Sequence, residues 1–287
     1  MAHQPAHWPD DPDQDDPPVG VSIRPLGADQ LPLLPPPPAP MLPVLPEPTG
    51  RHTTVFGTPG ASAMGQYRRR RAAEWADFLR TLPLRLGAVA AAGLLAGTLA
   101  RHAGVAAPAA AIAAGGLGFL LRFRVSADTT AWRRGAKGER RTARRLRRLG
   151  RGWTVFHDLA IPGSRANADH LVLGPPGVFL IDSKNYRGRL TLSPEGSLWY
   201  GHHPLTGVLA TVRWEAAVLS QALGTSVNPM LCIHGAQLPW GELMAEGVPV
   251  LAAGRVTTTL RALPPLLNEI QLALLAEQAR RQLQPST

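Results

Sequence analysis

Two short apolar segments, residues 168–173 and 178–184, are separated by the sequence Gly174-Pro-Pro-Gly177. Glycine and proline favour the backbone angles of a tight turn. Each flanking segment has the length and the branched apolar residues of a strand. The pattern therefore predicts two antiparallel strands joined by a short hairpin turn, and we place the other predicted elements around this hairpin.

The segments on both sides of the hairpin complete a domain over residues 132–287. We expect helices and further strands as follows: helices over 135–149, 212–223 and 266–283, and strands over 153–157, 227–233 and 248–252. This stretch is long enough to bury one hydrophobic core. The order predicts an α/β fold, a mixed sheet flanked by helices. Residues 132–235 form most of this domain, and residues 236–287 complete it with a strand and a helix.

The first part of the chain has a different composition. Residues 1–65 hold more than half of the 29 prolines and few aromatic residues, so they cannot bury enough apolar surface to offset the entropy of ordering. We expect a disordered tail with polyproline II segments, which either docks a proline-recognising partner or is a solvated leader. Residues 1–50 carry seven acidic side chains against one arginine. The rest of the chain is strongly basic, which favours nucleic acid or anionic lipid as a partner.

Two uncharged apolar runs, residues 86–100 and 105–121, follow a basic segment at residues 66–85 that contains four consecutive arginines. Each run is slightly shorter than the roughly 20 residues of a membrane-spanning helix. Because arginines cluster on the outer sides of the pair, the positive-inside rule predicts a helical membrane hairpin over 86–121 with both outer ends in the cytoplasm. The alternative is a soluble pair of alanine-rich helices packed on the domain.

The opening sequence and the cysteine count restrict the compartment. The chain begins MAHQPAHWPDDPDQDD, without a basic region followed by an apolar core, so we expect no secretory signal peptide. A single cysteine, Cys232, excludes a disulfide scaffold and a multi-cysteine metal site, and suggests a reducing compartment. We expect the chain at the cell membrane, with both termini and the domain on the cytoplasmic side.

Charged residues are concentrated at one end of the predicted hairpin. Asp182 and Lys184 share one face of their strand because alternate residues point the same way, and Asp169 lies at about the same level on the partner strand. Charges among apolar strands are costly unless they are paired or bind a metal. Two carboxylates supply the oxygen ligands that Mg²⁺ or Mn²⁺ prefers, and such an ion activates a water for attack on a phosphodiester. The alternative is an ion-pair network without a further function.

Lys184 is unusual in this chain, because only it and Lys137 are lysines among the 30 basic side chains. A lysine beside a metal-bound water can orient the water, deprotonate it or stabilise the negative charge of the transition state. Arginine cannot act as the base because it does not lose its proton in proteins. The presence of a lysine at position 184 therefore agrees with phosphodiester hydrolysis.

A predicted helix on each side of the hairpin adds a polar candidate. In the helix over 135–149, Glu139 lies on the inward stripe, where it either joins the two aspartates or is stabilised only by the helix dipole. In the helix over 212–223, Gln221 continues the stripe of Trp214 and Val218. It would bind the attacking water, hold the lysine or only cap a buried backbone group.

The helix over 135–149 also carries rows of arginines on its outer side. These residues predict a sequence-independent, salt-sensitive contact with the phosphates of nucleic acid, and anionic lipid is the competing partner. The residues are Arg140, Arg141, Arg144, Arg145 and Arg148. His170 follows Asp169 and points to the opposite face of the sheet, so we interpret it as a structural hydrogen-bonding residue rather than a base.

Several short motifs follow one another in a specific order. They are Gly135-Ala-Lys-Gly-Glu139, Val155-Phe-His-Asp-Leu159, Asn167-Ala-Asp-His170, Leu173-Gly-Pro, Gly177-Val-Phe-Leu-Ile-Asp-Ser-Lys-Asn185, Gly188 and Gln221. With these motifs the chain resembles the NERD (nuclease-related) domain family over about residues 135–235. It departs from the family pattern at Asp182, where Glu is more usual, and at Ala168, where a larger aliphatic residue is usual.

The resemblance implies a restriction-endonuclease-like PD-(D/E)XK core. It also implies a phosphodiesterase site that uses Mg²⁺ or Mn²⁺, with Asp169, Asp182 and Glu139 as metal ligands, Lys184 as a further catalytic residue and Gln221 in support. We therefore expect a divalent-metal-dependent nuclease that acts on DNA or RNA at the cytoplasmic face of a membrane. The alternatives are a catalytically inactive module that holds nucleic acid or a protein at the membrane, and a structural membrane protein whose tail recruits partners.

Overall fold

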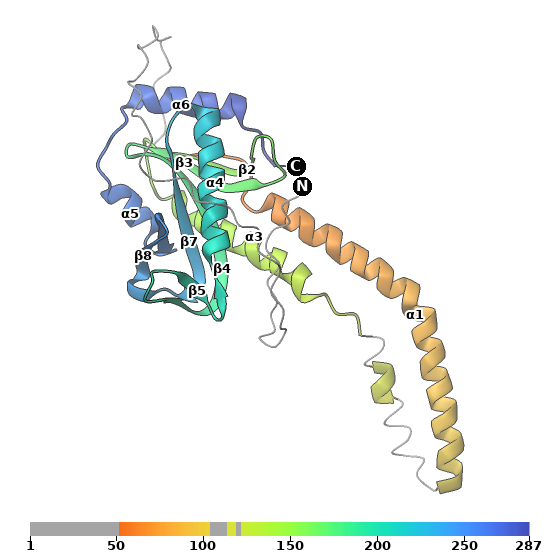
Figure 1. Ribbon diagram of the computed structural model, residues 1–287. Coiled ribbons are helices and arrows are strands. Elements are labelled where there is room, and N and C mark those ends of the chain that lie inside the picture. Colours follow the sequence, from red (N-terminus) through yellow and green to blue (C-terminus); the bar gives the residue numbers. More distant parts are fainter. Residues whose placement is uncertain (1–51, 104–113, 119–121, 287) are drawn as a thin grey trace.

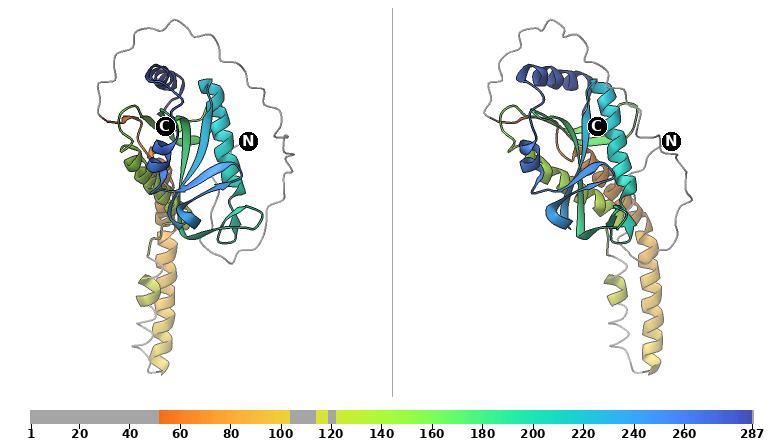
Figure 2. Two further views of the ribbon diagram at one scale, coloured as in Figure 1. Left: turned by 90° about the vertical axis from the view of Figure 1, so that its left-hand side faces the viewer. Right: turned by 60° about the vertical axis from the view of Figure 1, so that its left-hand side comes forward.

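The computed structural model describes residues 52–103, 114–118 and 122–286. In this part of the chain, nine strands form one sheet with helices on both faces (Figures 1 and 2). The larger elements, in chain order, are β1 (Thr54–Phe56), α1 (Ala61–Ala103), α3 (Ala127–Leu146), β2 (Thr154–Ala160), β3 (Asn167–Gly174), β4 (Gly177–Leu192), β5 (Leu198–Tyr200), β6 (His203–Pro204), α4 (Thr206–Leu223), β7 (Val227–Gln237), β8 (Glu242–Ala245), β9 (Val248–Ala252), α5 (Val256–Ala262) and α6 (Glu269–Gln282). The expected mixed α/β sheet flanked by helices is confirmed.

The main path of the sheet runs in the order β1-β2-β3-β4-β7-β9-β8, with β5 paired to β4 and to β6. Strand pairs β1/β2, β4/β7 and β7/β9 are parallel, and the others are antiparallel. The predicted hairpin is β3–β4, and Gly174 pairs with Gly177 across its turn. Strands β1, β5, β6 and β8 and helix α5 were not expected from the sequence.

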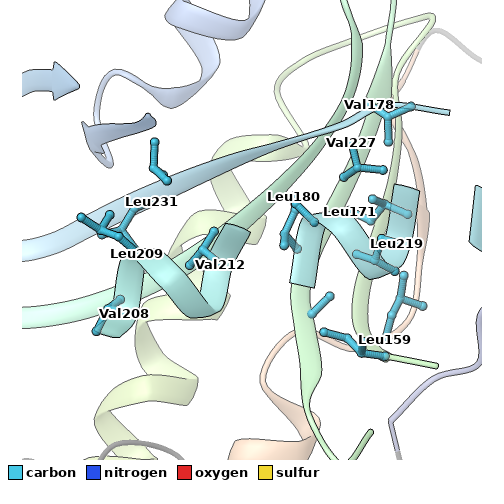
Figure 3. Packing of buried hydrophobic residues seen from close by; sticks show 14 of the residues in the cluster. Leu159, Leu171, Val178, Leu180, Val208, Leu209, Val212, Leu219, Val227 and Leu231 are labelled. Atoms are coloured by element: carbon cyan, nitrogen blue, oxygen red, sulfur yellow. The ribbon is translucent and has the colours of Figure 1, made fainter. Parts of the chain in front are cut away.

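Each face of the sheet is covered by a different pair of helices. Helices α4 and α6 pack over one face through a cluster that includes Leu171, Leu180, Leu209, Leu219 and Leu231 (Figure 3). Helices α3 and α5 cover the other face through a second cluster, which includes Leu146, Val172, Ile181, Cys232 and Leu260. Both faces of the central strands are therefore dry, as is usual for strands with helices on both sides.

Strand β4 is the longest strand and contributes to both clusters. Its residues are buried without interruption from Val178 to Ser183. Alternate side chains therefore point to α4 on one face and to α3 on the other. Lys184 is the first residue that regains partial exposure. The sheet thus places the charged residues of β4 where its buried segment ends.

Residues 54–65 differ from the tail that we expected over residues 1–65. Strand β1 pairs in parallel with β2, and the rings of Phe56 and Phe156 stack with centroids 4.9 Å apart. The backbone N–H of Ser62 donates to Asp158 Oδ2 at 2.6 Å. Residues 54–65 therefore belong to the domain, because these contacts tie the start of α1 to β2. The rest of the expected tail lies outside the described residues, apart from residues 52 and 53.

Helix α1 joins the segment expected as a separate basic region, residues 66–85, to the first apolar run. Tyr67 and Phe78 are buried in its first half, and α1 packs along α3 there. Glu74 accepts hydrogen bonds from the hydroxyls of Ser126 and Thr129 at the start of α3. Ser126 is also the N-cap of α3, so this helix begins earlier than the expected residue 135.

The second half of α1 leaves the domain and runs away from it (Figure 1). Within the described residues, one helical stretch, Ala61–Leu95, is long and apolar enough to cross a membrane by length and composition. Its outer part exposes large apolar side chains, including Leu84 and Leu94. The second apolar run, residues 105–121, lies outside the described residues except for 114–118, so the membrane hairpin stays a prediction.

The turn between β3 and β4 depends on the absence of a side chain at Gly174. A Cβ atom at this position would overlap the indole ring of Trp153, which is buried. We expect Gly174→Ala to lower the free energy of unfolding by about 1–3 kcal/mol, because the buried ring or the backbone must shift to admit the methyl group. Thermal or urea unfolding of the two proteins measures this difference.

The matched control is Gly207→Ala in the first turn of α4. Its Cβ would meet no atom within 4 Å, and the backbone there is helical. This variant should be neutral or slightly more stable, because alanine favours helices by about 0.5–1 kcal/mol over glycine. Equal losses in both variants would contradict the packing argument.

Candidate active site

The site begins where β3 and β4 separate. The two strands pair from Gly174 and Gly177 to His170 and Ile181, and no further pair follows. Beyond that point Asp169 Oδ2 accepts a hydrogen bond from the backbone N–H of Ser183 at 2.8 Å. A carboxylate thus takes the place of a backbone acceptor. The register of the ladder places Asp169 opposite Asp182, as the sequence predicted.

Asp182 and Lys184 form a close ion pair on β4. Lys184 Nζ donates a hydrogen bond to Asp182 Oδ1 at 2.9 Å and lies 2.8 Å from Oδ2. Asp182 is buried, whereas the Lys184 side chain is 32% exposed. Burial opposes the charge of Lys184, but the carboxylates of Asp182 and Asp169 outweigh it and raise the lysine pKa above its usual range. Lys184 is therefore an ammonium at neutral pH, which can donate hydrogen bonds but cannot take up a proton.

Glu139 lies on the buried side of α3, as expected. The helix approaches β4 closely at Gly138, where a Cβ would lie only 3.1 Å from the Cβ of Asn185, and Asn185 Nδ2 donates to the Arg134 carbonyl at 2.9 Å. Burial and the nearby carboxylate of Asp158 raise the Glu139 pKa to about 7. Asp158 lies on β2 and is a neighbour that the sequence reasoning did not include.

The acidic groups of the site affect one another. The pKa of Asp169 is raised well above its usual value, first by burial and then by Glu139 and Asp182. Within the described residues, Glu139 Oε2 and Asp182 Oδ2 are buried without a hydrogen bond. Each carboxylate therefore disfavours the charge of the others, and a cation at this point would lower their pKa values.

Sequence reasoning missed Glu215 on α4. Glu215 is buried, and burial followed by the charge of Asp182 raises its pKa to about 8. It belongs to the inward stripe of α4 together with Val212, Ala216 and Leu219. An acid within an otherwise apolar stripe was the signal that could have identified it.

Gln221 was expected in the site, and the structure corrects this expectation. Gln221 is exposed on α4, and Trp214, which was expected on the same inward stripe, is 40% exposed. The inward stripe of the helix is rotated by one residue from the predicted one, because Leu209, Val212 and Leu219 fill the cluster against the sheet (Figure 3). The structure therefore does not bring Gln221 to the carboxylates.

His170 lies on the α3 face of the sheet, away from Asp182 and Lys184. Its Nδ1 is 2.8 Å from Nδ1 of His157, and both rings are fully buried. Burial lowers the pKa of both imidazoles, that of His157 to about 4. The pair is neutral and structural, in agreement with the interpretation of His170 from the sequence.

The arginines of α3 line two pockets. One pocket, with a volume of about 380 Å³, is lined by Arg141, Arg144, Arg145, Arg148 and His234. The other, of about 290 Å³, is lined by Arg140, Arg144 and Arg147 together with Thr58, Pro59 and Ala143. The carboxylates and Lys184 line neither pocket. The arginines predicted to bind nucleic acid are thus grouped on the flanks of α3.

The carboxylates have the donor chemistry of a divalent-metal site, but they are not arranged as a complete one. In the part of the chain that the structure describes, no group of three or more His, Cys, Asp or Glu side chains is arranged to hold a metal ion. Asp182 instead contacts Lys184, so a cation would compete with the lysine for this carboxylate.

The buried acid Glu215 predicts a pH-dependent stability. Its pKa in the folded chain is about 8 against an ordinary value of 4.5, so the folded state holds a proton that the unfolded state has lost between these two values. Stability should therefore fall as the pH rises from about 5 to about 8. We expect the melting temperature of Glu215→Gln to fall less over this range than that of the unchanged chain. Glu242→Gln, at an exposed position, is the control, and the same slope in all three proteins would contradict the assignment.

Comparison with known proteins gives one match. The family model of NERD, the nuclease-related domain, matches residues 134–236, which span α3, the β2–β4 strands, α4 and most of β7. No curated protein and no solved structure matches the chain. The matched range contains Glu139, Asp169, Asp182, Lys184 and Glu215. The resemblance inferred from the motifs is confirmed: residues 134–236 match the model of the nuclease-related domain family.

Proposed function

We propose that this protein is a divalent-metal-dependent nuclease that hydrolyses phosphodiester bonds of DNA or RNA beside a membrane. The observation that carries the proposal is that the carboxyls of Glu139 on α3, Asp169 on β3 and Asp182 on β4 influence one another's charge, while Asp182 forms an ion pair with Lys184. A purely structural ion pair would need one carboxylate for one lysine. The additional buried acids favour a site that handles a cation and a phosphate.

The metal ligands in this proposal are Glu139, Asp169 and Asp182. Their oxygens are hard donors of the kind that Mg²⁺ and Mn²⁺ prefer. One of these oxygens, Glu139 Oε2, is buried without a hydrogen bond, which supports a role toward a cation. When bound, such an ion would polarise the phosphodiester and lower the pKa of a water.

The chain's own residues have separate tasks in this reaction. Lys184 is held as an ammonium by Asp182, so it donates hydrogen bonds to a phosphate oxygen and offsets the charge that develops there. The charges of Asp182 and Lys184 act on Glu215, and with a pKa of about 8 this acid loses its proton at slightly alkaline pH, where it can accept the proton of the attacking water. In this assignment Glu215, and not Gln221, is the residue of α4 that acts on the attacking water.

The substrate would be attracted by charge rather than by base sequence. Arg140, Arg141, Arg144, Arg145 and Arg148 give the α3 side of the domain a strong positive field. Such a field raises the association rate of a polyanion and loses strength with salt. Helix α1 would hold this domain at the cytoplasmic face, because it continues from the domain into the stretch long and apolar enough to cross a membrane.

The decisive test is cleavage of labelled single- and double-stranded DNA and RNA by the full chain in detergent, with Mg²⁺ or Mn²⁺. We expect metal-dependent cleavage that Lys184→Ala lowers by at least about 100-fold, because the charge on the transition state loses its partner. Lys137→Ala is the matched control, since Lys137 is the other lysine of the chain and is exposed on α3.

Two results would contradict the nuclease. If both lysine variants and the unchanged chain bind nucleic acid equally and none cleaves it, the fold serves as a binding module. If the chain neither binds nor cleaves nucleic acid at low salt, the tail and α1 must carry the function. Removal of the metal with a chelator should abolish cleavage and leave charge-driven binding intact.

A second pair of variants tests the correction on α4. Glu215→Gln should lower the cleavage rate by about 100-fold and flatten its dependence on pH, because the amide cannot accept a proton. Gln221→Ala should retain full activity, because this side chain is exposed and outside the site. The reverse ranking of the two variants would restore the assignment made from the sequence.

A further inference from the structure

The arginines of one pocket on the flank of α3 attract a polyanion in the reaction proposed above, but the buried histidine among them has no task in that reaction. This pocket is lined by Arg141, Arg144, Arg145, Arg148 and His234. His234 follows Ile233 on β7, and because neighbouring side chains of a strand alternate, it points to the α3 face while Ile233 packs in the cluster under α4. Asp182 and Lys184 belong to the α4 face of β4. His234 of the pocket and the Asp182–Lys184 pair therefore lie on opposite faces of the same strand ends.

The four arginines concentrate positive charge without a compensating acid. Three of them, Arg141, Arg144 and Arg145, occupy positions i, i+3 and i+4 of α3, and Arg148 follows directly after the end of the helix. Among the residues that the structure describes, none of them forms an ion pair with a carboxylate. Like charges at this spacing repel one another, and a bound anion would remove that repulsion.

His234 adds a neutral hydrogen-bonding group to the pocket. Its side chain is buried, and its Nε2 lies 2.8 Å from Thr142 Oγ1. Burial, followed by the charge of Arg141, lowers the His234 pKa to about 4. At neutral pH the pocket therefore presents four guanidinium groups around an uncharged imidazole.

We propose that this pocket binds a small anion with a free terminal phosphate, such as pyrophosphate or a nucleoside triphosphate. Guanidinium groups match phosphate oxygens in charge and in geometry, because each offers paired N–H donors. A volume of about 380 Å³ accommodates a few linked phosphates. The proposal does not depend on nuclease activity, because the pocket shares none of its lining residues with the carboxylate site.

A terminal phosphate fits this pocket better than the interior of a nucleic-acid strand. His234 is only 6% exposed, so a group that reaches it must be narrow and must enter end-on. A phosphate within a strand is flanked by a sugar on both sides, whereas a terminal phosphate has three free oxygens. A strand that crosses the pocket would contact the outer arginines and leave His234 unused.

Calorimetry with the full chain in detergent tests the proposal, in about 0.15 M salt and with a chelator present. Pyrophosphate and adenosine triphosphate should each bind with one-to-one stoichiometry. The double variant Arg145→Gln/Arg148→Gln should bind them at least about tenfold more weakly, because two charge-assisted contacts are lost. The double variant Arg165→Gln/Arg189→Gln removes the same charge from exposed positions elsewhere and should bind normally.

A second measurement locates the ligand without a variant. In spectra of the histidine rings, pyrophosphate should shift the signals of His234 and leave those of the exposed His202 unchanged. The Lys184→Ala protein should bind pyrophosphate as tightly as the unchanged chain. A chain that binds pyrophosphate but cleaves nothing would therefore refute the nuclease and retain this pocket.

Three results would overturn the proposal. The first is no binding of either phosphate compound. The second is binding that the Arg145→Gln/Arg148→Gln variant does not weaken. The third is an unphosphorylated oligonucleotide that binds through these arginines while pyrophosphate fails to displace it, since the surface would then contact the interior of a strand.

Discussion

The candidate site depends on the ion pair between Lys184 and Asp182, which lies among several other acidic side chains. Lys184 contacts Asp182 directly, and the remaining carboxyls of Asp169, Glu139 and Glu215 have raised pKa values because burial and mutual repulsion disfavour their charged forms. A buried pair costs less than isolated charges, but extra acids beside it weaken a fold. Apolar groups of similar volume often stabilise a core as well as a buried ion pair does, so this cluster is a candidate functional site rather than a source of stability.

Side chains alternate between the two faces along β4 and β7, so neighbouring residues of each strand give the two faces of the sheet different chemistry. Asp182 and Lys184 point toward α4, whereas Ser183 lies between them and points toward α3, where its hydroxyl is 2.7 Å from Thr142 Oγ1. Thr142 in turn reaches His234 of the arginine pocket. The backbone N–H of Ser183 holds Asp169. Ser183 thus contributes its backbone to one site and its side chain to the polar contacts beneath the other.

Much of the site could be predicted because strands have a strict period of two. The hairpin turn fixed the register of Asp169 against Asp182, and alternation placed Lys184 beside them. The helix α4 was harder to predict, because the stripe of Trp214, Val218 and Gln221 and the stripe through Val212, Glu215 and Leu219 lie on different sides of the helix and both contain apolar residues, so only packing against the sheet selects between them. The arginine pocket could not be predicted from the sequence, because His234 and the arginines are far apart in the chain and only the fold brings them together. Strand β1 was not predicted, because the many prolines near it led us to expect a disordered tail.

The start of α1 connects the apolar helix to the candidate site, which has a consequence for function. Ser62 is bound by Asp158, whose carboxylate raises the Glu139 pKa, and the Gly60 backbone donates to Glu139. Asp158 also accepts from Asn167 Nδ2 at 2.8 Å and adopts a left-handed backbone angle, so this junction is held from several sides. A chain that begins after α1 would lose these contacts together with β1. The candidate carboxylate Glu139 on α3 and the helix that leaves the domain are therefore parts of one packed unit, so the geometry of the candidate site depends on α1.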